Sequence, residues 1–249
     1  MLRTDMAESI AFVPGLDDRN PRVMWMVVWR NSKGYTVSSW MMESLPVGTH
    51  SCGCQSLRHR AKLVVLTGGP GGGKSAILEL ARLYLCRHVV FVPEAASIVF
   101  GGGFPRVPGT AGLQAAQRAI FRIQREMEEL ARGNPEAGMV VCDRGTIDGL
   151  AYWPGKPDAF FKSAGTTMEA ELKRYSAIVH IATPASSQQY QKNNIRHESL
   201  PQARKIDTRI SELWAPHPHN HKVSSATDFI DKATVAIQIL RDHLPKCCR

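Results

Sequence analysis

The 249-residue chain has no apolar run long enough to cross a membrane. Its longest hydrophobic stretches, such as Val23–Trp29, fall far short of the ~20 residues that a transmembrane helix requires. Sustained heptads and internal repeats are also lacking, which excludes coiled-coil and repeat architectures. With 43% hydrophobic and 21% charged residues, the composition is that of an ordinary globular protein of one or two domains.

A disulfide framework is also missing. The six cysteines show no paired spacing, and we interpret all of them as reduced thiols in a cytoplasmic protein. Early acidic residues argue against a mitochondrial leader, and no secretory signal is visible. Cys52-Gly-Cys54 is half of a metal-binding pattern, but no second Cys/His pair lies at finger spacing, so the sequence does not predict a metal site there.

Acidic residues are outnumbered. Lysine and arginine exceed aspartate and glutamate by 31 − 22 = 9, and such an excess favours anionic partners: nucleotide phosphates, nucleic acid or an anionic membrane surface. Nucleic acid is the least favoured of the three, because basic and aromatic residues do not interleave and no known reader motif is present.

The sequence predicts two regions. Residues 1–60 lack a sustained hydrophobic period, and we expect a poorly structured extension there, with a folded accessory hairpin as the alternative. Residues 61–249 alternate strand and helix patterns, which is typical of an α/β fold: a three-layer domain with a mostly parallel sheet and helices on both faces. The expected strands are Lys62–Thr67, Val89–Val92, Met139–Cys142, Ala177–Ala182 and a short Lys222–Val223, and the expected helices are Ser75–Arg87, Leu113–Arg132 and Asp228–Leu244.

The strongest motif follows the first of these strands. It satisfies the pattern G-x-x-x-x-G-K-[ST], in which glycines let backbone N–H groups surround phosphate oxygens. The lysine reaches the β- and γ-phosphates, the serine hydroxyl ligates Mg²⁺, and the helix adds its positive end. A tightly packed glycine turn without a ligand is the alternative. The predicted nucleotide-binding residues are Gly68, Gly69, Pro70, Gly71, Gly72, Gly73, Lys74, Ser75 and Ala76.

Two further strands end in charged residues. Glu94 follows Val89–Val92, at the carboxyl ends of the strands, where ligands bind in open α/β sheets. There it could accept a proton from an acceptor hydroxyl or orient that hydroxyl. The alternative is that Glu94 compensates the dipole of the helix that follows. Asp143 and Arg144 end Met139–Cys142, where an acid would hold Mg²⁺ and an arginine would meet phosphate charge. Asp148 could support the same site, but for this residue we favour a helix-capping role.

The segment 186–210 is rich in Gln, Asn and basic residues, among them Arg196 and Arg204. It lies between the fourth strand and the last helix, and we expect it to be a basic lid that closes over the transferring phosphoryl group. The alternative is a solvated charged face.

Together these segments resemble the NadR-like AAA-type ATPase/kinase domains of the P-loop superfamily. The resemblance runs from about Lys62 to Leu244, and its motifs stand here as Thr67–Lys74, Val92–Ala96, Asp143–Tyr152, Thr183-Pro184, Arg196-His197-Glu198 and Trp214–Pro218. It implies a nucleoside-kinase-like fold in a family that spans kinases and regulatory modules binding GTP and phosphoinositides. The similar deoxynucleoside kinases carry Glu-Arg-Ser in place of Asp143-Arg144-Gly145. In those kinases the helix before the third strand presents a glutamine to the catalytic base, and the resemblance implies that Gln117 or Gln124 has this role here.

The leading hypothesis is therefore an Mg²⁺-dependent, ATP-binding kinase or ATPase for a small hydroxyl-bearing, nucleoside-like acceptor. The absence of an N-K-x-D box favours ATP over GTP. The alternative is a nucleotide-gated regulatory module that binds a phosphoinositide or a protein. The predicted metal ligands are Ser75 and Asp143, and the predicted catalytic residues are Lys74, Glu94, Asp143, Arg144, Arg196 and Arg204.

Overall fold

A computed structural model describes residues 45–56, 58–184, 199–224 and 228–249, together with the backbone of three short strands before them. The chain divides into two compact units, Met1–Leu45 and Pro46–Arg249. Residues 46–60, which the sequence predicts to be part of the extension, therefore lie in the second unit.

The described part of the first unit is an antiparallel sheet in the order β1-β2-β3. Its strands are β1 (Glu8–Ala11), β2 (Met26–Arg30) and β3 (Thr36–Trp40). These strands lie within residues 1–60, for which a folded accessory hairpin is the alternative to a poorly structured extension.

The second unit is built on a five-stranded sheet in the order β5-β6-β4-β7-β8, and all four neighbouring pairs are parallel. This confirms the predicted fold class. Parallel strands covered on both faces are expected to be continuous apolar runs, and β4, β5 and β6 are almost fully buried along their lengths. The strands are β4 (Lys62–Thr67), β5 (Val89–Val92), β6 (Met139–Asp143), β7 (Tyr175–Ile181) and β8 (Asn220–Val223).

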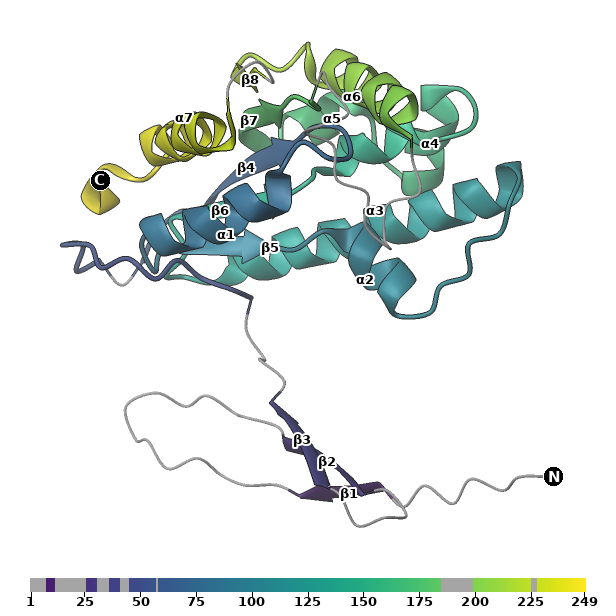
Figure 1. Cartoon of the computed structure of the whole chain (residues 1–249). Coiled ribbons are helices and arrows are strands. Elements are labelled where there is room, and N and C mark those ends of the chain that lie inside the picture. Colours follow the sequence, from purple (N-terminus) through teal and green to yellow (C-terminus); the bar gives the residue numbers. More distant parts are fainter. Residues whose placement is uncertain are drawn as a thin grey trace. The chain divides into compact units, whose positions relative to one another are not determined.

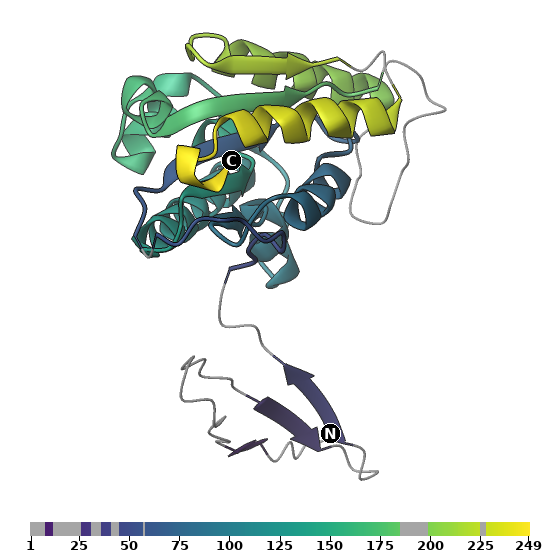
Figure 2. The ribbon, with the colours of Figure 1, turned by 90° about the vertical axis from the view of Figure 1, so that its left-hand side faces the viewer.

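Helices cover both faces of this sheet (Figures 1 and 2). Helices α1 and α7 pack together on one face, and the long α3 packs against β4, β5 and β6 on the other. The helical elements are α1 (Lys74–Tyr84), α2 (Ala95–Gly101), α3 (Thr110–Gly133), η1 (Thr146–Ala151), α4 (Pro157–Ala164), α5 (Met168–Leu172), α6 (Leu200–Trp214), α7 (Phe229–Asp242) and η3 (Lys246–Cys248).

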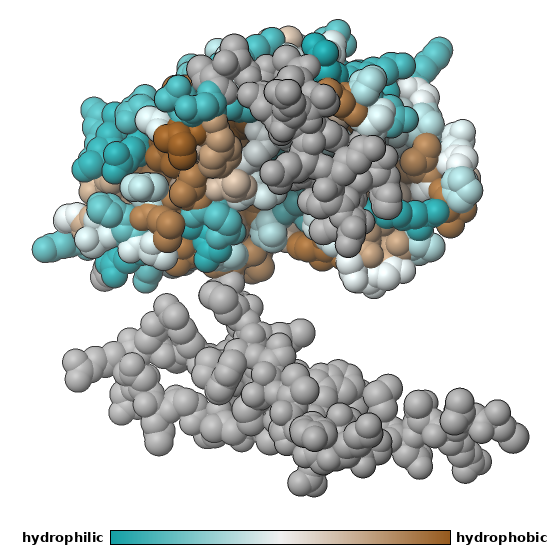
Figure 3. All heavy atoms as spheres, viewed as in Figure 1, coloured by the Kyte–Doolittle hydropathy of each residue, from teal (hydrophilic) through white to brown (hydrophobic). Residues whose placement is uncertain are grey.

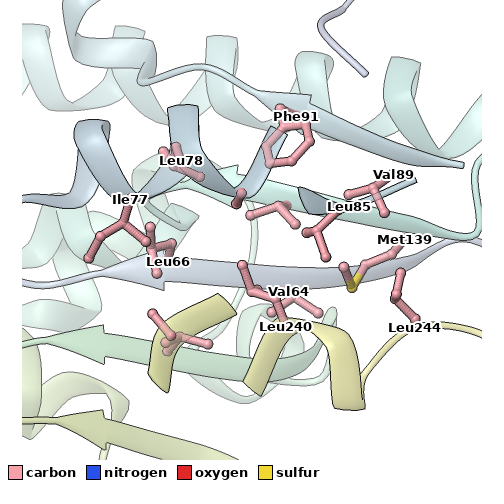
Figure 4. Close-up of a cluster of buried hydrophobic side chains, with 14 of the residues drawn as sticks. Val64, Leu66, Ile77, Leu78, Leu85, Val89, Phe91, Met139, Leu240 and Leu244 are labelled. Carbon is pink, nitrogen blue, oxygen red and sulfur yellow. The ribbon is translucent and has the colours of Figure 1, made fainter. Parts of the chain in front are cut away.

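The main core lies between the sheet and the α1–α7 layer (Figure 4). Val64 and Leu66 of β4 meet Ile77 of α1 and Leu240 of α7 there, and all four side chains are fully buried. Burying one such side chain stabilises the fold by roughly 1.5–3 kcal/mol. The core therefore fixes α1, and with it the start of that helix, against the carboxyl end of β4.

The strand order reverses direction around β4. The chain leaves β4 through α1 to reach β5 on one side, and it later passes from β6 to β7 on the other side. Ligands of open α/β sheets bind in the crevice at the carboxyl ends of such strands. The turn after β4 therefore occupies the expected ligand position.

On the face seen in Figure 3, hydrophobic residues of the second unit form separate patches between hydrophilic ones. No helix in the described parts of the chain combines the length and the hydrophobicity that a membrane crossing needs.

Candidate functional site: a phosphate loop linked to an arginine–glutamate pair

The glycine-rich motif forms the turn between β4 and α1. Gly68 has a φ of +132°, and Gly73, the N-cap of α1, has a φ of +90°; L side chains rarely adopt such conformations. A Cβ on Gly68 would also lie 2.1 Å from the carbonyl oxygen of Ile181. The first turn of α1 has no acidic residue, so no carboxylate of that turn competes with an anion for the positive end of the helix.

The side chain of Lys74 folds back over this loop. It is buried, and its Nζ donates hydrogen bonds to the carbonyl oxygens of Gly68 (2.9 Å) and Gly69 (2.8 Å). Burial, reinforced by the nearby Arg144 charge, lowers the pKa of Lys74 from 10.5 to about 8. The ammonium group is thus held among neutral acceptors, and a polyphosphate would offer it stronger, charged ones.

Arg144 connects the loop to the residue that follows β5. Its Nε donates to Glu94 Oε1 (2.6 Å), and its Nη1 donates to the Gly68 carbonyl oxygen (3.2 Å). The residue has a φ of +71°, the left-handed region in which a non-glycine residue is strained by about 1–3 kcal/mol. The structure therefore brings Glu94, Arg144 and the loop together, as the sequence led us to expect of a shared site.

Glu94 is a strongly held carboxylate. Burial would raise its pKa, but Arg144 and the Ser97 hydroxyl, which donates to Oε2 at 2.6 Å, outweigh that effect and lower the pKa to about 2. A carboxylate with so low a pKa is a weak proton acceptor. In this arrangement Glu94 orients the Arg144 guanidinium, and it becomes a stronger base only when that guanidinium moves away.

Asp143 lies beside this pair and is almost fully buried. Burial raises its pKa to about 6, although the Lys74 charge opposes the shift. Ser75 lies exposed in the first turn of α1. A carboxylate and a hydroxyl are hard oxygen donors of the kind that Mg²⁺ prefers, so the chemistry of the predicted metal ligands fits that ion.

Comparison with known proteins identifies the family. A family described as an AAA domain matches residues 63–232. The chain belongs to this family. Solved structures also match the chain, 211 chains in all, and no curated protein sequence matches it.

One of these structures is the crystal structure of NadR protein in complex with NAD and AMP-PNP, with a TM-score of 0.50 and 14% sequence identity. The match covers 74% of the AAA domain chain and 49% of the NadR chain, so the present chain spans about half the length of that protein. At this identity the likeness concerns the fold, and it confirms the resemblance to NadR-like P-loop domains.

Asp148 forms hydrogen bonds to three different elements. Its Oδ2 accepts hydrogen bonds from Thr67 Oγ1 (2.7 Å) and from the N–H of Gly145 (3.3 Å). Its Oδ1 accepts one from Trp214 Nε1 (2.6 Å). The carboxylate thus connects the end of β4, η1 and α6. The helix-capping role favoured from the sequence is present in the bond from the Gly145 N–H, because Gly145 is the N-cap residue of η1.

Sequence reasoning missed Asp207 as a site residue. This residue of α6 accepts hydrogen bonds at Oδ1 from the Gly69 N–H (2.6 Å) and at Oδ2 from the Thr183 N–H (3.1 Å). His180 Nε2 lies 3.0 Å from Oδ1, and Thr183 Oγ1 donates to the Pro70 carbonyl oxygen (3.2 Å). The only sequence signal is the Thr183-Pro184 pair after β7, which belongs to the family pattern but has no role assigned from the sequence.

The predicted lid is described only from residue 199 onward. Its described part is α6, and Arg204 is exposed on that helix. The carbonyl oxygen of Ala203 lies 2.8 Å from where a Cβ on Gly69 would be, so this part of α6 packs directly on the loop. Arg196 lies outside the described residues.

The two candidate glutamines are both buried on α3. Gln124 donates from Nε2 to Glu128 Oε1 (2.9 Å) and to the Arg144 carbonyl oxygen (3.1 Å). It therefore supports the backbone of Arg144. Gln117 packs near Gly149, since its Oε1 lies 3.1 Å from where a Cβ on that glycine would be.

Proposed function

We propose that this AAA domain is an Mg²⁺-dependent phosphotransferase that uses ATP and acts on a small hydroxyl-bearing acceptor of nucleoside type. One observation carries the proposal: Arg144 contacts both the Glu94 carboxylate and the Gly68 carbonyl oxygen. A single guanidinium thus joins the loop that would hold the phosphates to the carboxylate that would face the acceptor.

Nucleotide binding would exchange partners around the loop. Lys74 and Arg144 now donate to the neutral carbonyl oxygens of Gly68 and Gly69. Charged phosphate oxygens make stronger hydrogen bonds than neutral carbonyls, so the β- and γ-phosphates would draw both cations towards themselves. Backbone N–H groups between Gly71 and Ala76 would hold the remaining phosphate oxygens.

The same exchange would prepare Glu94. When Arg144 turns to the γ-phosphoryl group, Glu94 loses the cation that holds its pKa near 2, and its basicity rises. The acceptor hydroxyl can then give its proton to the Glu94 carboxylate while its oxygen attacks the γ-phosphorus and ADP leaves. The base is thus activated only when the nucleotide is in place.

Two proposed roles concern the metal and the lid. Ser75 and Asp143 would hold Mg²⁺, and the ion would neutralise phosphate charge there. Arg204 would add positive charge over the γ-phosphoryl group, since its helix α6 already lies against the loop through Asp207. We assign the same role to Arg196. Arginines used in this way can raise phosphoryl-transfer rates by roughly 10³–10⁵.

A regulatory module that binds ATP or GTP and recruits a phosphoinositide or a protein is the second candidate. It is favoured by the tight ion pair of Arg144 and Glu94, whose low pKa makes Glu94 a weak base in the nucleotide-free protein. The basic balance of the chain, with a net charge of +9, fits an anionic partner as well.

A phosphate-transfer screen over nucleosides, nucleotides and inositides tests the kinase proposal, with Lys74→Ala as the blank. Glu94→Gln should abolish transfer while nucleotide affinity persists, and Glu126→Gln, an exposed position on α3, is the matched control. No transfer to any acceptor, together with lipid or protein capture that requires nucleotide, would favour the regulatory module.

A further inference from the structure

Seven soft ligand side chains gather at the edge of the sheet opposite the phosphate loop. They come from three segments: the stretch before β4, the connection between α1 and β5, and η3. Figure 1 shows the dark-blue stretch before β4 and the yellow terminal helix at the same end of the sheet, away from the arrowhead of β4. The side chains are Cys52, Cys54, His59, Cys86, His88, Cys247 and Cys248.

The first group of four ligands surrounds His88. The sulfur atoms of Cys52 and Cys248 each lie 3.4 Å from His88 Nδ1, and that of Cys86 lies 3.9 Å from it. The four ligand atoms are all within 4.8 Å of one another.

The second group surrounds His59. The sulfur atoms of Cys54 and Cys247 each lie 3.4 Å from His59 Nε2, and that of Cys248 lies 3.7 Å from it. These four atoms also lie within 4.8 Å of one another. Cys248 belongs to both groups.

These spacings match the edges of a metal-centred tetrahedron. With Zn–S of about 2.3 Å and Zn–N of about 2.0–2.1 Å, neighbouring sulfur and nitrogen ligands lie about 3.6 Å apart. The measured sulfur–nitrogen separations run from 3.4 to 3.9 Å. A disulfide would need sulfur atoms about 2.0 Å apart, whereas all six cysteines are free, and the sulfur atoms of Cys247 and Cys248 are 3.9 Å apart.

Backbone contacts hold the ligand-bearing segments in place. The N–H groups of Gly48 and His50 donate to the carbonyl oxygens of Val89 and Leu85, and the His59 N–H donates to that of Pro135. The carbonyl oxygen of His88 accepts from the N–H groups of Gly138 and Met139. The ligands are therefore positioned by the sheet and its connections and do not depend on one loose loop.

We propose that this cluster binds two Zn²⁺ ions that share the Cys248 thiolate. One ion is held by Cys52, Cys86, His88 and Cys248, and the other by Cys54, His59, Cys247 and Cys248. Three cysteine sulfurs and one histidine nitrogen in a tetrahedron are a ligand set typical of zinc. Each coordinating thiol gives up its proton when the metal binds.

The site has a structural role. All four positions around each ion are filled by protein side chains, as in closed structural zinc sites that contribute directly to folding energy. It fastens Cys52, Cys54, His59 and η3 to the amino end of β5 and leaves the phosphate loop at the opposite edge untouched. This reverses the expectation from Cys52-Gly-Cys54, because the remaining ligands are distant in sequence and only the fold brings them together.

Metal analysis of the full chain, purified without chelators after growth with added zinc, tests the proposal. We expect about two zinc ions per chain by plasma mass spectrometry, and a thiolate-to-metal charge-transfer band after replacement by Co²⁺. Wild-type protein with no stoichiometric zinc overturns the proposal without any appeal to a variant.

Variants of the two groups test the arrangement. Cys52→Ser and Cys54→Ser should each lower the content to about one ion, because each removes a ligand of one ion only. Cys142→Ala is the matched control, since Cys142 is a buried cysteine of β6 outside the cluster, and it should keep both ions. The two-ion arrangement is overturned if the wild type holds one ion that only one of the two variants loses. It is also overturned if Cys142→Ala loses as much zinc as they do.

Discussion

The carboxylate of Asp207 accepts a hydrogen bond of 2.6 Å from the backbone N–H of Gly69, 138 positions earlier in the chain. This contact attaches α6, the described part of the predicted lid, to the phosphate loop. It also occupies a backbone donor of the kind that holds phosphate in such loops. The position of α6 and the state of the loop are therefore linked through one side chain.

Replacing Asp207 by asparagine tests that link. Asn keeps the size of the side chain but has one acceptor oxygen instead of two, so the Gly69 and Thr183 N–H groups cannot both keep their partners. We expect the free energy of unfolding to fall by about 1–3 kcal/mol, the cost of leaving a buried donor unpaired. Urea denaturation measures the change. Glu212→Gln, an exposed position on the same helix, should change it little, and equal stability of the two variants would contradict the link.

Much of the sheet could be predicted from the sequence because each buried strand is marked by the residues of that strand alone. The strands Lys62–Thr67 and Val89–Val92 were predicted with the bounds that the structure has, since buried parallel strands are continuous apolar runs. Short elements were missed: α2 has seven residues and η1 six, too few to show a helical period. The helix predicted for 113–132 begins earlier, at Thr110, because no capping side chain marks its start.

The candidate site also has parts that local sequence predicts and parts that it does not. The phosphate loop is a contiguous motif, and its glycines carry their conformational requirement in the local sequence. Asp207 and Gly69 are remote in the chain, so no local pattern could pair them. The left-handed backbone of Arg144 depends on partners from other elements, such as Gln124, which donates to its carbonyl oxygen.

Gly68 should tolerate no side chain. An added Cβ would lie 2.1 Å from the Ile181 carbonyl oxygen, and the φ of +132° is unfavourable for any L residue. We expect Gly68→Ala to destabilise the protein by more than about 2 kcal/mol, as overpacking and backbone strain combine. Thermal unfolding measures the effect. Gly133→Ala, at the end of α3 with nothing within 4 Å of the added Cβ, should be neutral or slightly stabilising, and a similar loss in both variants would contradict the argument.

Metal-dependent nucleotide binding should weaken in mild acid. Asp143 must be ionised to bind Mg²⁺, and burial raises its pKa to about 6, so the Mg²⁺-dependent part of the affinity should be lost as the pH falls through that value. Calorimetric titration of the nucleotide with and without Mg²⁺ across this range measures it.

Asp143→Asn provides the control for that prediction. Its affinity should be low and should change less with pH around 6 than that of the wild type, because the Asp143 carboxyl no longer titrates. A wild-type affinity that is constant from about one pH unit below to about two units above the expected midpoint would show that Asp143 does not bind the metal.

Lys74 should bind nucleotide at a cost to the stability of the nucleotide-free protein. Burial lowers its pKa from 10.5 to about 8, so the unfolded chain binds the proton more tightly than the folded one, and the stability of the free protein should rise between about pH 8 and 10.5. Lys74→Met removes the buried charge and keeps the length of the apolar stem. It should therefore be at least as stable as the wild type at pH 7 and should lose the rise above pH 8, whereas the melting-temperature increase caused by ATP and Mg²⁺ should disappear. Thermal scans with and without nucleotide measure both quantities in one experiment. A variant that is less stable without nucleotide but still stabilised by it would show that the ammonium group braces the loop and does not bind the phosphates.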